Sequence, residues 1–245
     1  MAPKFSIITV CRNEAENIRQ TCESICSQTY SDFEWIIIDG ESTDGTLDIL
    51  AEYSSKISCF VSEPDGGIYD AMNKGVQRAT GEYLLFLNGG DYLADECALA
   101  RVAAAPDRDV LYGDLLYLRD DGTSYIQAFP DMLSSGFLAR RTLPHQASFI
   151  RRGLFLRYGM YDTSIRISAD YDLFVRFLHV HKASYFHIPC VLAVFRSGGI
   201  SCLKPHLNAM EYHEIRKKHF SWLLYGRKRL KTEWRIRFDR SRFPK

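Results

Sequence analysis

Residues 34–46 read EWIIIDGESTDGT and set the pattern for the first half of the chain. The apolar run Trp35 to Ile38 is typical of a strand that is buried on both faces of a parallel sheet. The run ends at Asp39, and the polar, glycine-containing segment 40–45 predicts a turn before a helix that begins near Leu47. The stretch therefore predicts a strand–turn–helix unit with an acidic residue at the carboxyl end of the strand.

The same alternation recurs on both sides of this stretch. Apolar runs predict further strands at 5–10, 57–62 and 83–87, and helical apolar spacing predicts helices at about 18–26 and 68–79. Strands that alternate with helices indicate right-handed β-α-β units, so the sequence predicts an α/β fold with a mainly parallel central sheet. Ligands of such sheets bind beyond the carboxyl ends of the strands, which here are followed by polar residues in every case.

The second half is less regular. Residues 109–118 and 123–129 predict strands joined by a hairpin turn at Asp120-Asp121-Gly122. Residues 170–181 have helical apolar spacing, and residues 183–196 predict one or two strands around Pro189.

The composition is typical of a folded, water-soluble protein. The 245 residues are 46% hydrophobic and 25% charged, and no apolar run approaches the ~20 residues of a membrane span. No signal peptide is expected at the start, and the seven cysteines include no paired C-x-x-C of a zinc ribbon. We expect a cytoplasmic protein with reduced thiols.

The charge is unevenly distributed, although the net charge is only +1. Residues 201–245 carry 13 Lys/Arg against 4 Asp/Glu, whereas residues 1–200 carry 18 against 26. Apolar and aromatic residues are interleaved with the basic ones over 212–245, which is typical of a basic amphipathic helix. We expect this tail to bind an anionic membrane surface; a merely solvated helix is the alternative, and no nucleic-acid partner is expected.

The acidic strand ends indicate a nucleotide diphosphate bound together with a divalent cation, since hard cations bridge carboxylate and phosphate oxygens. Carboxylates also accept hydrogen bonds from a base N–H or from ribose hydroxyls. The sequence has no G-x-x-x-x-G-K-[ST] loop, and no G-x-G-x-x-G follows the first strand. These absences argue against a P-loop nucleotidase and a dinucleotide enzyme.

Four segments follow one another along the chain: SIITVCRNE (6–14), IIIDGESTDGT (36–46), AMNKGVQRATGEYLLFLNGGD (71–91) and SADYDLFVR (168–176). Together they resemble the inverting glycosyltransferases of family 2, which have the GT-A fold. The segment EPDGGIYDAMNKG (63–75) narrows the resemblance to the bacterial branch that builds exopolysaccharide, capsule and O-antigen units. The resemblance covers about residues 5–200.

The resemblance implies a role for individual residues. Asp170 would be the catalytic base that deprotonates the acceptor hydroxyl, with Asp172 as the alternative base. His145 and Asp172 would lie near the acceptor, and a structural role is the alternative for His145. The nucleotide sugar would contact residues near the strand ends: Thr9, Asn13, Glu14, Asp39, Asp65, Lys74, Asn88, Gly89 and Arg196. Within this set Asp39 would accept a hydrogen bond from the base, and Lys74 and Arg196 would face the diphosphate.

The metal-binding D-x-D position of the family reads Asn88-Gly89-Gly90-Asp91 in this sequence, so a single carboxylate remains. Asp91 would bind Mg²⁺ or Mn²⁺, with the diphosphate of the donor completing the ligand shell. Metal-independent transfer is the alternative.

The resemblance also implies the overall organisation. A GT-A domain over 1–205 would consist of a nucleotide-binding half to about residue 115 and an acceptor-binding half over 116–205, followed by a basic extension over 206–245. It would move a sugar from a UDP-, GDP- or dTDP-sugar to a saccharide on a lipid diphosphate, at the inner face of the cytoplasmic membrane. The alternatives are a sugar-nucleotide nucleotidyltransferase and a degenerate protein that binds a nucleotide sugar without catalysis.

Overall fold

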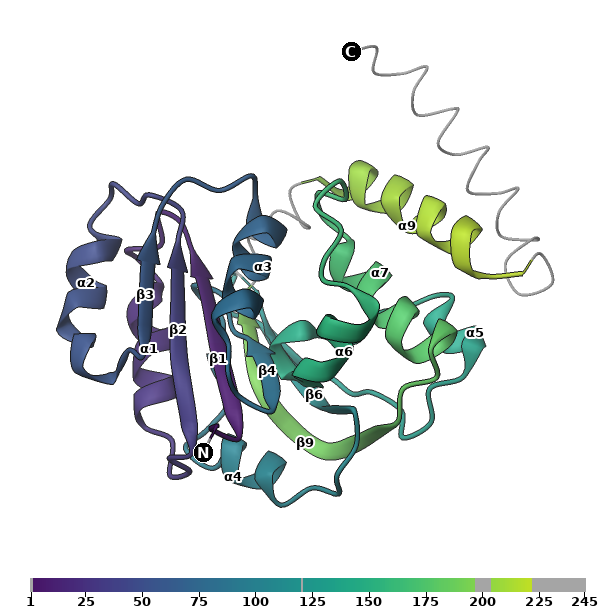
Figure 1. Cartoon of the computed structure of the whole chain (residues 1–245), viewed down its shortest axis with the longest axis horizontal. Coiled ribbons are helices and arrows are strands. Elements are labelled where there is room, and N and C mark those ends of the chain that lie inside the picture. The colour runs from purple at the N-terminus through teal and green to yellow at the C-terminus, as the bar shows by residue number, and fades with distance from the viewer. Residues whose placement is uncertain (1, 120, 197–203, 222–245) are drawn as a thin grey trace, which may run out of the picture.

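The computed structural model describes residues 2–119, 121–196 and 204–221, which form a nine-stranded sheet with helices on both faces (Figure 1). The strands follow the order β3-β2-β1-β4-β8-β6-β9-β5, and β7 pairs with β6. Most of the predicted basic tail, residues 222–245, lies outside the described residues.

The strands predicted in the first half form the parallel part of the sheet. β1 (Phe5–Cys11) lies between β2 (Phe33–Asp39) and β4 (Tyr83–Phe86), and β3 (Cys59–Ser62) pairs with the outer side of β2. Every residue of β1 and β4 is buried, as their continuous apolar runs predict. The predicted α/β fold is therefore confirmed.

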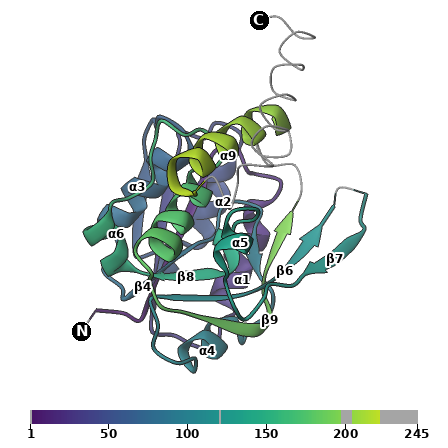
Figure 2. The same ribbon diagram turned by 90° about the vertical axis from the view of Figure 1, so that its right-hand side faces the viewer.

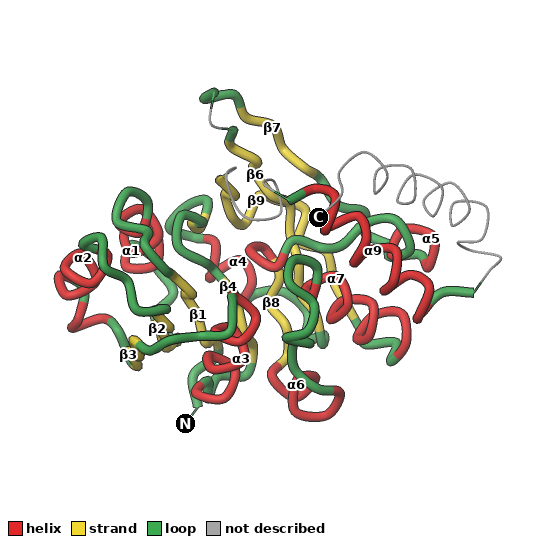
Figure 3. The backbone as a smooth tube through the Cα atoms, turned by 90° about the horizontal axis from the view of Figure 1, so that it is seen from above, coloured by secondary structure: helices red, strands yellow, loops and turns green. Residues whose placement is uncertain are grey.

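Helices cover both faces of this parallel part. α1 (Ile18–Cys26) and α2 (Thr46–Glu52) lie on one side of the strands, and α3 (Ile68–Arg78) lies on the other (Figures 1 and 3). α3 approaches β1 very closely at Gly75, where an added Cβ would lie 2.4 Å from Ile8 Cγ2. The helix can pack at this depth only because residue 75 has no side chain.

The second half of the sheet is mixed. β8 (Ser148–Arg151) is antiparallel to both of its neighbours, β4 and β6 (Val110–Leu118). β9 (Tyr185–Arg196) runs parallel to β6 with a register irregularity around Asp114, and β5 (Tyr92–Leu93) is antiparallel to β9. The predicted hairpin is confirmed: β7 (Ser124–Gln127) pairs antiparallel with β6, and the hairpin projects from the body (Figure 2).

The helix predicted from Asp170 is confirmed as α7 (Ala169–Phe174), which continues as the π-helical segment η3 (Val175–Val180). Several shorter elements were not predicted, because they span too few residues to show a hydrophobic period. They are β5, α4 (Ala98–Ala103), α5 (Ser135–Leu138), α6 (Arg152–Tyr158), η1 (Ser54–Lys56) and η2 (His145–Ala147).

α9 (Pro205–His219) forms the beginning of the predicted extension and packs on the body. The Glu211 carboxylate accepts hydrogen bonds from the main-chain N–H groups of residues 166–168, at 2.8–2.9 Å, just before α7. The ring of Tyr212 stacks on Tyr171 at 4.2 Å between centroids. No helix among the described residues has the length and apolar character needed to cross a membrane.

The close contact between α3 and β1 makes a stability prediction. Gly75→Ala should lower the free energy of unfolding by about 1–3 kcal/mol, because the methyl group overlaps Ile8 and pushes the helix off the sheet. Gly153→Ala in α6 is the matched control: no atom lies within 4 Å of its added Cβ, so alanine should be neutral or stabilising. Urea unfolding of both variants checks this, and equal midpoints would contradict it.

Candidate active site

The loops that follow β1, β2, β3 and β4 gather at one edge of the sheet, because the carboxyl ends of parallel strands align. Asn13 and Glu14 follow β1, and Asp39 ends β2. Asp65 follows β3, and Asn88 follows β4. The polar residues selected from the sequence thus share one edge.

The loop after β1 is bonded to the loop after β2. The main-chain N–H of Asn13 donates to Ser42 Oγ (2.8 Å), and Asn13 Oδ1 accepts from the main-chain N–H of Thr43 (2.9 Å). The N–H of Glu14 donates to Thr46 Oγ1 (2.8 Å). Asn13 has a φ of 54°, a left-handed conformation that asparagine tolerates better than most residues. The side-chain amide of Asn13 therefore holds the loop after β1 against the loop after β2.

Asp39 is fully buried at the junction of β2 and β3. Its carboxylate accepts hydrogen bonds from Ser42 Oγ (2.5 Å), from the Ser42 N–H (3.0 Å) and from Ser62 Oγ (2.6 Å). Both oxygens are therefore occupied by the protein itself. Contact with a nucleotide base would require one of the two serine hydroxyls to move away.

Thr9 corrects the prediction that its side chain lines the nucleotide pocket. The residue is completely buried in β1, and its Oγ1 accepts a hydrogen bond from Trp35 Nε1 (3.0 Å). Because Trp35 is the largest side chain of the core, its indole N–H needs a buried acceptor. Thr9 supplies that acceptor and has no surface left for a ligand.

Asp65 lies at the carboxyl-end edge of the sheet, and Lys74 is bonded to the two residues that precede Asp65. An added Cβ on Gly40 would lie 2.5 Å from Asp65 Oδ2, so this carboxylate reaches across to the end of β2. Lys74 Nζ donates to the Pro64 carbonyl (2.7 Å) and pairs with Glu63 (2.9 Å), a hydrogen bond that raises the pKa of Lys74. The predicted contact of Lys74 with the diphosphate stays a prediction; in this structure the ammonium binds the Pro64 carbonyl and Glu63 in the 63–67 loop.

The turn after β4 is packed tightly against the first loop. An added Cβ on Gly89 would lie 2.8 Å from Glu14 Cγ and 3.2 Å from Cys11 Cβ, and Gly90 has a φ of 93°. Both positions therefore favour glycine, one for space and the other for backbone conformation. Burial raises the pKa of the Glu14 carboxyl beside this turn.

Asp91 ends the turn in a nearly closed environment, with only 5% of its surface exposed. Burial raises its pKa to about 7, although the proximity of His145 and hydrogen bonds from Gln146 and from the main-chain N–H of Arg196 lower it. A carboxyl group with this pKa exchanges a proton near neutral pH.

His145 connects Asn88 to Asp170, two residues that are 82 positions apart in the chain. Its Nε2 lies 3.2 Å from Asn88 Nδ2, and its Nδ1 lies 3.8 Å from Asp170 Oδ2. The Tyr69 hydroxyl lies 3.3 Å from Asp170 Oδ1. The side chain of Asp170 is 17% exposed, so it is supported by the protein and still open to a substrate.

Asp172, which was predicted to lie near the acceptor, makes its contacts outside this cluster. Its carboxylate is 1% exposed and pairs with Arg176 Nε (2.7 Å) and His219 Nε2 (3.1 Å). Burial alone would raise its pKa, but the hydrogen bonds from His219 and Arg176 lower it to about 2. Asp172 therefore joins α7 to the end of α9 and does not contact an acceptor.

Arg196 lies against α1. Its guanidinium donates to Asn17 Oδ1 (3.1 Å) and Gln20 Oε1 (2.9 Å), and its Nε is buried without a hydrogen-bond partner among the described residues. Contact with a diphosphate would require it to exchange these two amide oxygens. The predicted flap at 197–199 lies outside the described residues.

The residues of the turn fit a divalent cation only in part. Asn88 Oδ1 is a buried oxygen with no hydrogen-bond partner in the described part of the chain, and the carboxyl groups near this turn are those of Asp91 and Glu14. Across residues 2–119, 121–196 and 204–221, no three His, Cys, Asp or Glu side chains are arranged to hold a metal ion. A cation here would therefore take most of its ligands from the diphosphate.

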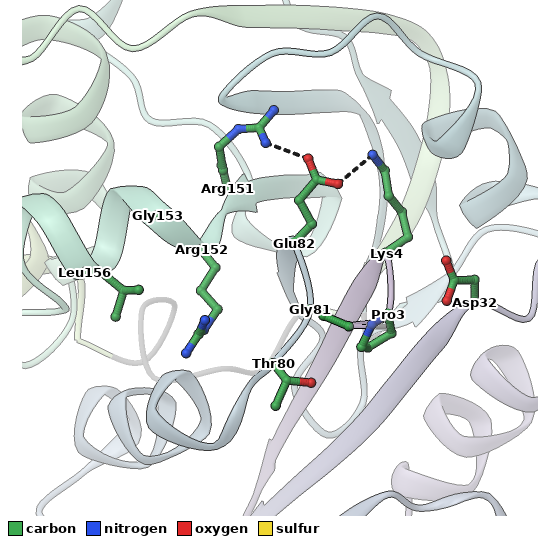
Figure 4. A pocket seen from close by; sticks show the side chains of 11 residues that line it. Pro3, Lys4, Asp32, Thr80, Gly81, Glu82, Arg151, Arg152, Gly153 and Leu156 are labelled. Carbon is green, nitrogen blue, oxygen red and sulfur yellow. Dashed lines mark hydrogen bonds and ion pairs between the residues drawn. The ribbon is translucent and has the colours of Figure 1, made fainter.

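A hollow of about 560 Å³ lies at the opposite end of the parallel strands, lined by residues that precede β1, β2 and β4 and by residues of β8 and α6 (Figure 4). The Glu82 carboxylate crosses it and bonds to Lys4 Nζ (2.9 Å) and Arg151 Nη1 (2.5 Å). Because it is at the amino ends of the strands, this hollow is not part of the candidate site.

Two residues of the site were not selected from the sequence. Tyr69 supports Asp170, and Gln146 donates to Asp91. Tyr69 lies within the segment 63–75 that the resemblance includes, and Gln146 directly follows His145. Their contacts depend on pairings across the fold, so spacing alone does not indicate them.

The family model described as "Glycosyl transferase family 2" matches residues 6–161. The chain belongs to this family. A "PGL/p-HBAD biosynthesis glycosyltransferase" of Mycobacterium tuberculosis is 40% identical over 202 aligned positions, and the match covers 75% of this chain and 77% of that protein. An uncharacterised glycosyltransferase of the same species is 31% identical over 204 residues, 81% of this chain and 77% of that one.

Solved structures share the fold of this glycosyltransferase at lower identity. S. aureus TarS 1–349 has a TM-score of 0.68 at 20% identity; the match covers 86% of this chain but only 64% of that one. The mannosyltransferase PcManGT from Pyrobaculum calidifontis, solved with GDP-Man and Mn²⁺, has a TM-score of 0.67 at 16% identity, with 95% and 69% covered. The family match and the GT-A neighbours confirm the predicted family, fold and transferase activity, and they argue against the nucleotidyltransferase alternative.

The Asp172 contacts make a prediction about the stability of this glycosyltransferase. The folded pKa of about 2 lies below the ordinary value of 3.8, so the stabilisation is present above about pH 4 and is lost as the pH falls through 2. Asp172→Asn should therefore lower the free energy of unfolding by about 2 kcal/mol at pH 7 and much less at pH 2. Urea unfolding at both pH values measures this, with the exposed Asp48→Asn as the control; a loss independent of pH would contradict it.

Proposed function

We propose that this family member is an inverting glycosyltransferase that moves a sugar from a nucleotide diphosphate sugar to a saccharide acceptor carried on a lipid, in bacterial surface polysaccharide synthesis. The observation that carries the proposal is the partly exposed Asp170, supported by Tyr69 and connected through His145 to the Asn88–Asp91 turn. Structural neighbours solved with UDP, UDP-GlcNAc and GDP-Man support a nucleotide-sugar donor.

In the proposed reaction, Asp170 removes the proton of the acceptor hydroxyl. The acceptor oxygen forms a bond to the anomeric carbon, while the bond from that carbon to the phosphate oxygen breaks on the opposite side and its electron pair leaves with the diphosphate. His145 holds the orientation of Asp170 relative to the turn at Asn88. The nucleotide lies over the loops of Asn13, Glu14, Asp39 and Asp65 at the strand ends.

A divalent cation, Mg²⁺ or Mn²⁺, would be held by Asp91 and the free amide oxygen of Asn88 and would neutralise charge on the leaving diphosphate. The tight packing of Gly89 against Glu14 fixes the position of the turn that would hold the cation. Arg196 adjoins Asp91 through its main-chain N–H and is the second cation of the proposal.

The proposed location is the inner face of the cytoplasmic membrane. It is supported by the excess of Lys and Arg in residues 201–245, which attracts an anionic leaflet by about 1 kcal/mol for each basic group near the surface. Sedimentation with anionic vesicles, compared with a chain shortened after residue 221, would test it; equal binding of the two chains would remove the membrane part of the proposal.

The role of Asp170 can be tested by substitution. Asp170→Asn should lower kcat for sugar transfer by roughly 10²- to 10⁴-fold, because the amide cannot take the acceptor proton. Nucleotide binding should be unchanged, since Asp170 lies on the acceptor side of the cluster. Release of nucleotide diphosphate from a panel of UDP-, GDP- and dTDP-sugars measures kcat, with the exposed Asp162→Asn as the control. Full activity of Asp170→Asn would rule out this mechanism.

The role of Asp91 predicts a pH dependence. With a pKa of about 7, Asp91 is mostly protonated at pH 6 and mostly ionised at pH 8, and only the carboxylate binds a cation. The Tm increase caused by UDP or GDP with Mn²⁺ should therefore be larger at pH 8 than at pH 6. Asp91→Asn should remove the part that depends on Mn²⁺, whereas Asp48→Asn should keep it. The same increase with and without Mn²⁺ at both pH values would instead support metal-independent transfer.

A further inference from the structure

Three aromatic rings form a row across neighbouring strands near the projecting hairpin. Phe195 on β9 pairs with Tyr117 on β6, and Tyr117 pairs with Tyr125 on β7. The Tyr117 centroid lies 5.0 Å from that of Phe195 and 5.1 Å from that of Tyr125. We call these three residues the aromatic row.

The aromatic row is exposed at its outer end. The surface of Tyr125 is 41% exposed, and Phe195 and Tyr117 are half-buried. The Arg119 guanidinium lies 5.1 Å from the centre of the Tyr125 ring. Cross-strand aromatic pairs stabilise hairpins, but that role alone leaves the apolar surface of this row exposed to water.

The aromatic row lies on the same face of the sheet as Asp170. Phe195 and Arg196 are consecutive in β9 and therefore point to opposite faces, and the Arg196 side chain reaches Asn17 and Gln20 at α1. Phe195 therefore points to the face opposite α1, which is the side of the sheet that α3 covers (Figures 1 and 3). α3 contacts Asp170 through Tyr69.

The aromatic row is also continuous with the candidate site along the chain. Phe195 directly precedes Arg196, whose main-chain N–H bonds to the Asp91 carboxylate. A ligand that contacted both the row and the turn at Asp91 would therefore cross β9 and β6 and end at the hairpin. Its two outer rings are about two strand spacings apart, roughly 10 Å, which suits a phenyl ring or a short alkyl chain.

We propose that the aromatic row binds an apolar alkyl or aryl aglycone of the acceptor, so that the sugar attached to it is presented to Asp170. The proposal rests on the proposed function, which makes Asp170 the acceptor side of the site. An apolar aglycone suits the row because three adjoining rings offer a surface of ring carbon, and the polar groups beside it are two tyrosine hydroxyls and the Arg119 guanidinium. The row would therefore select acceptors by the group to which the sugar is attached.

The hairpin provides a matched pair of substitutions. Ile126 is adjacent to Tyr125 and 60% exposed, but it points to the opposite face and pairs with Leu116. Tyr125→Ser removes one end of the aromatic row, Tyr125→Phe keeps it, and Ile126→Ser removes a similar exposed apolar group outside the row. Thermal unfolding of each variant shows whether the hairpin remains folded.

The test measures binding by calorimetry without a donor, so it does not depend on turnover. The probes are n-octyl, p-nitrophenyl and methyl glycosides of glucose, galactose, mannose and N-acetylglucosamine, used below the micelle concentration. Wild type should bind at least one octyl or nitrophenyl glycoside roughly tenfold more tightly than its methyl counterpart. Tyr125→Ser should lose this preference, and Tyr125→Phe, Ile126→Ser and Asp170→Asn should keep it.

Equal affinity of wild type for all three aglycones would overturn the proposal. Equal loss in Tyr125→Ser and Ile126→Ser would also overturn it, because it would indicate general apolar adsorption on the hairpin. If Asp170→Asn kept both full transfer activity and the aglycone preference, the proposed base would fail while the binding site remained. The two failures are therefore distinguishable.

Discussion

The hydroxyl of Tyr69 joins the two halves of this protein, and the candidate site depends on that link. It donates to the Ile167 carbonyl (2.5 Å) and lies 3.3 Å from Asp170 Oδ1. One turn further along α3, Asn73 exchanges two hydrogen bonds with the main chain of Tyr161, at 2.9 and 3.0 Å. Residues four apart share one face of a helix, so a single face of α3 holds the segment that leads into α7. Asp170 is thereby fixed against the parallel strands, and burial keeps the pKa of Tyr69 raised so that its hydroxyl remains a donor.

The parallel part of the fold was predictable because each of its strands is a continuous apolar run closed by a polar turn. Strands such as Trp35 to Ile38 are apolar on both faces and must therefore be buried on both. In the helices between them, apolar residues recur at the helical period. The mixed part was harder. β5 has two residues and α5 has four, too few for any period, and their formation depends on partners elsewhere in the sheet. The antiparallel direction of β8 is likewise a matter of long-range pairing and not of local composition.

The candidate site was predictable in residue type and approximate position, but not in orientation. Asp170 and Asp172 are two residues apart in one helix, so their side chains point in different directions. Asp172 is bound by His219 of α9, and Asp170 is the carboxylate that stays open to a substrate. Thr9 and Lys74 show the same limit. The Thr9 hydroxyl accepts a hydrogen bond from Trp35, and the Lys74 ammonium pairs with Glu63. Both contacts depend on how the chain folds and not on the local sequence. Asn88 and His145 come together only because β4 and η2 meet in space.

The position of β8 in the sheet has a consequence for folding during synthesis of the chain. β4 comprises residues 83–86, yet its second neighbour in the sheet is β8, residues 148–151. After the parallel strands have left the ribosome, β4 therefore remains an unpaired edge of buried-type apolar residues while about sixty more residues are made. Such an edge is the part of a nascent protein that associates with other chains. Rapid arrival of Ser148–Arg151 closes it, so the speed of translation through residues 90–150 bears on the yield of folded protein.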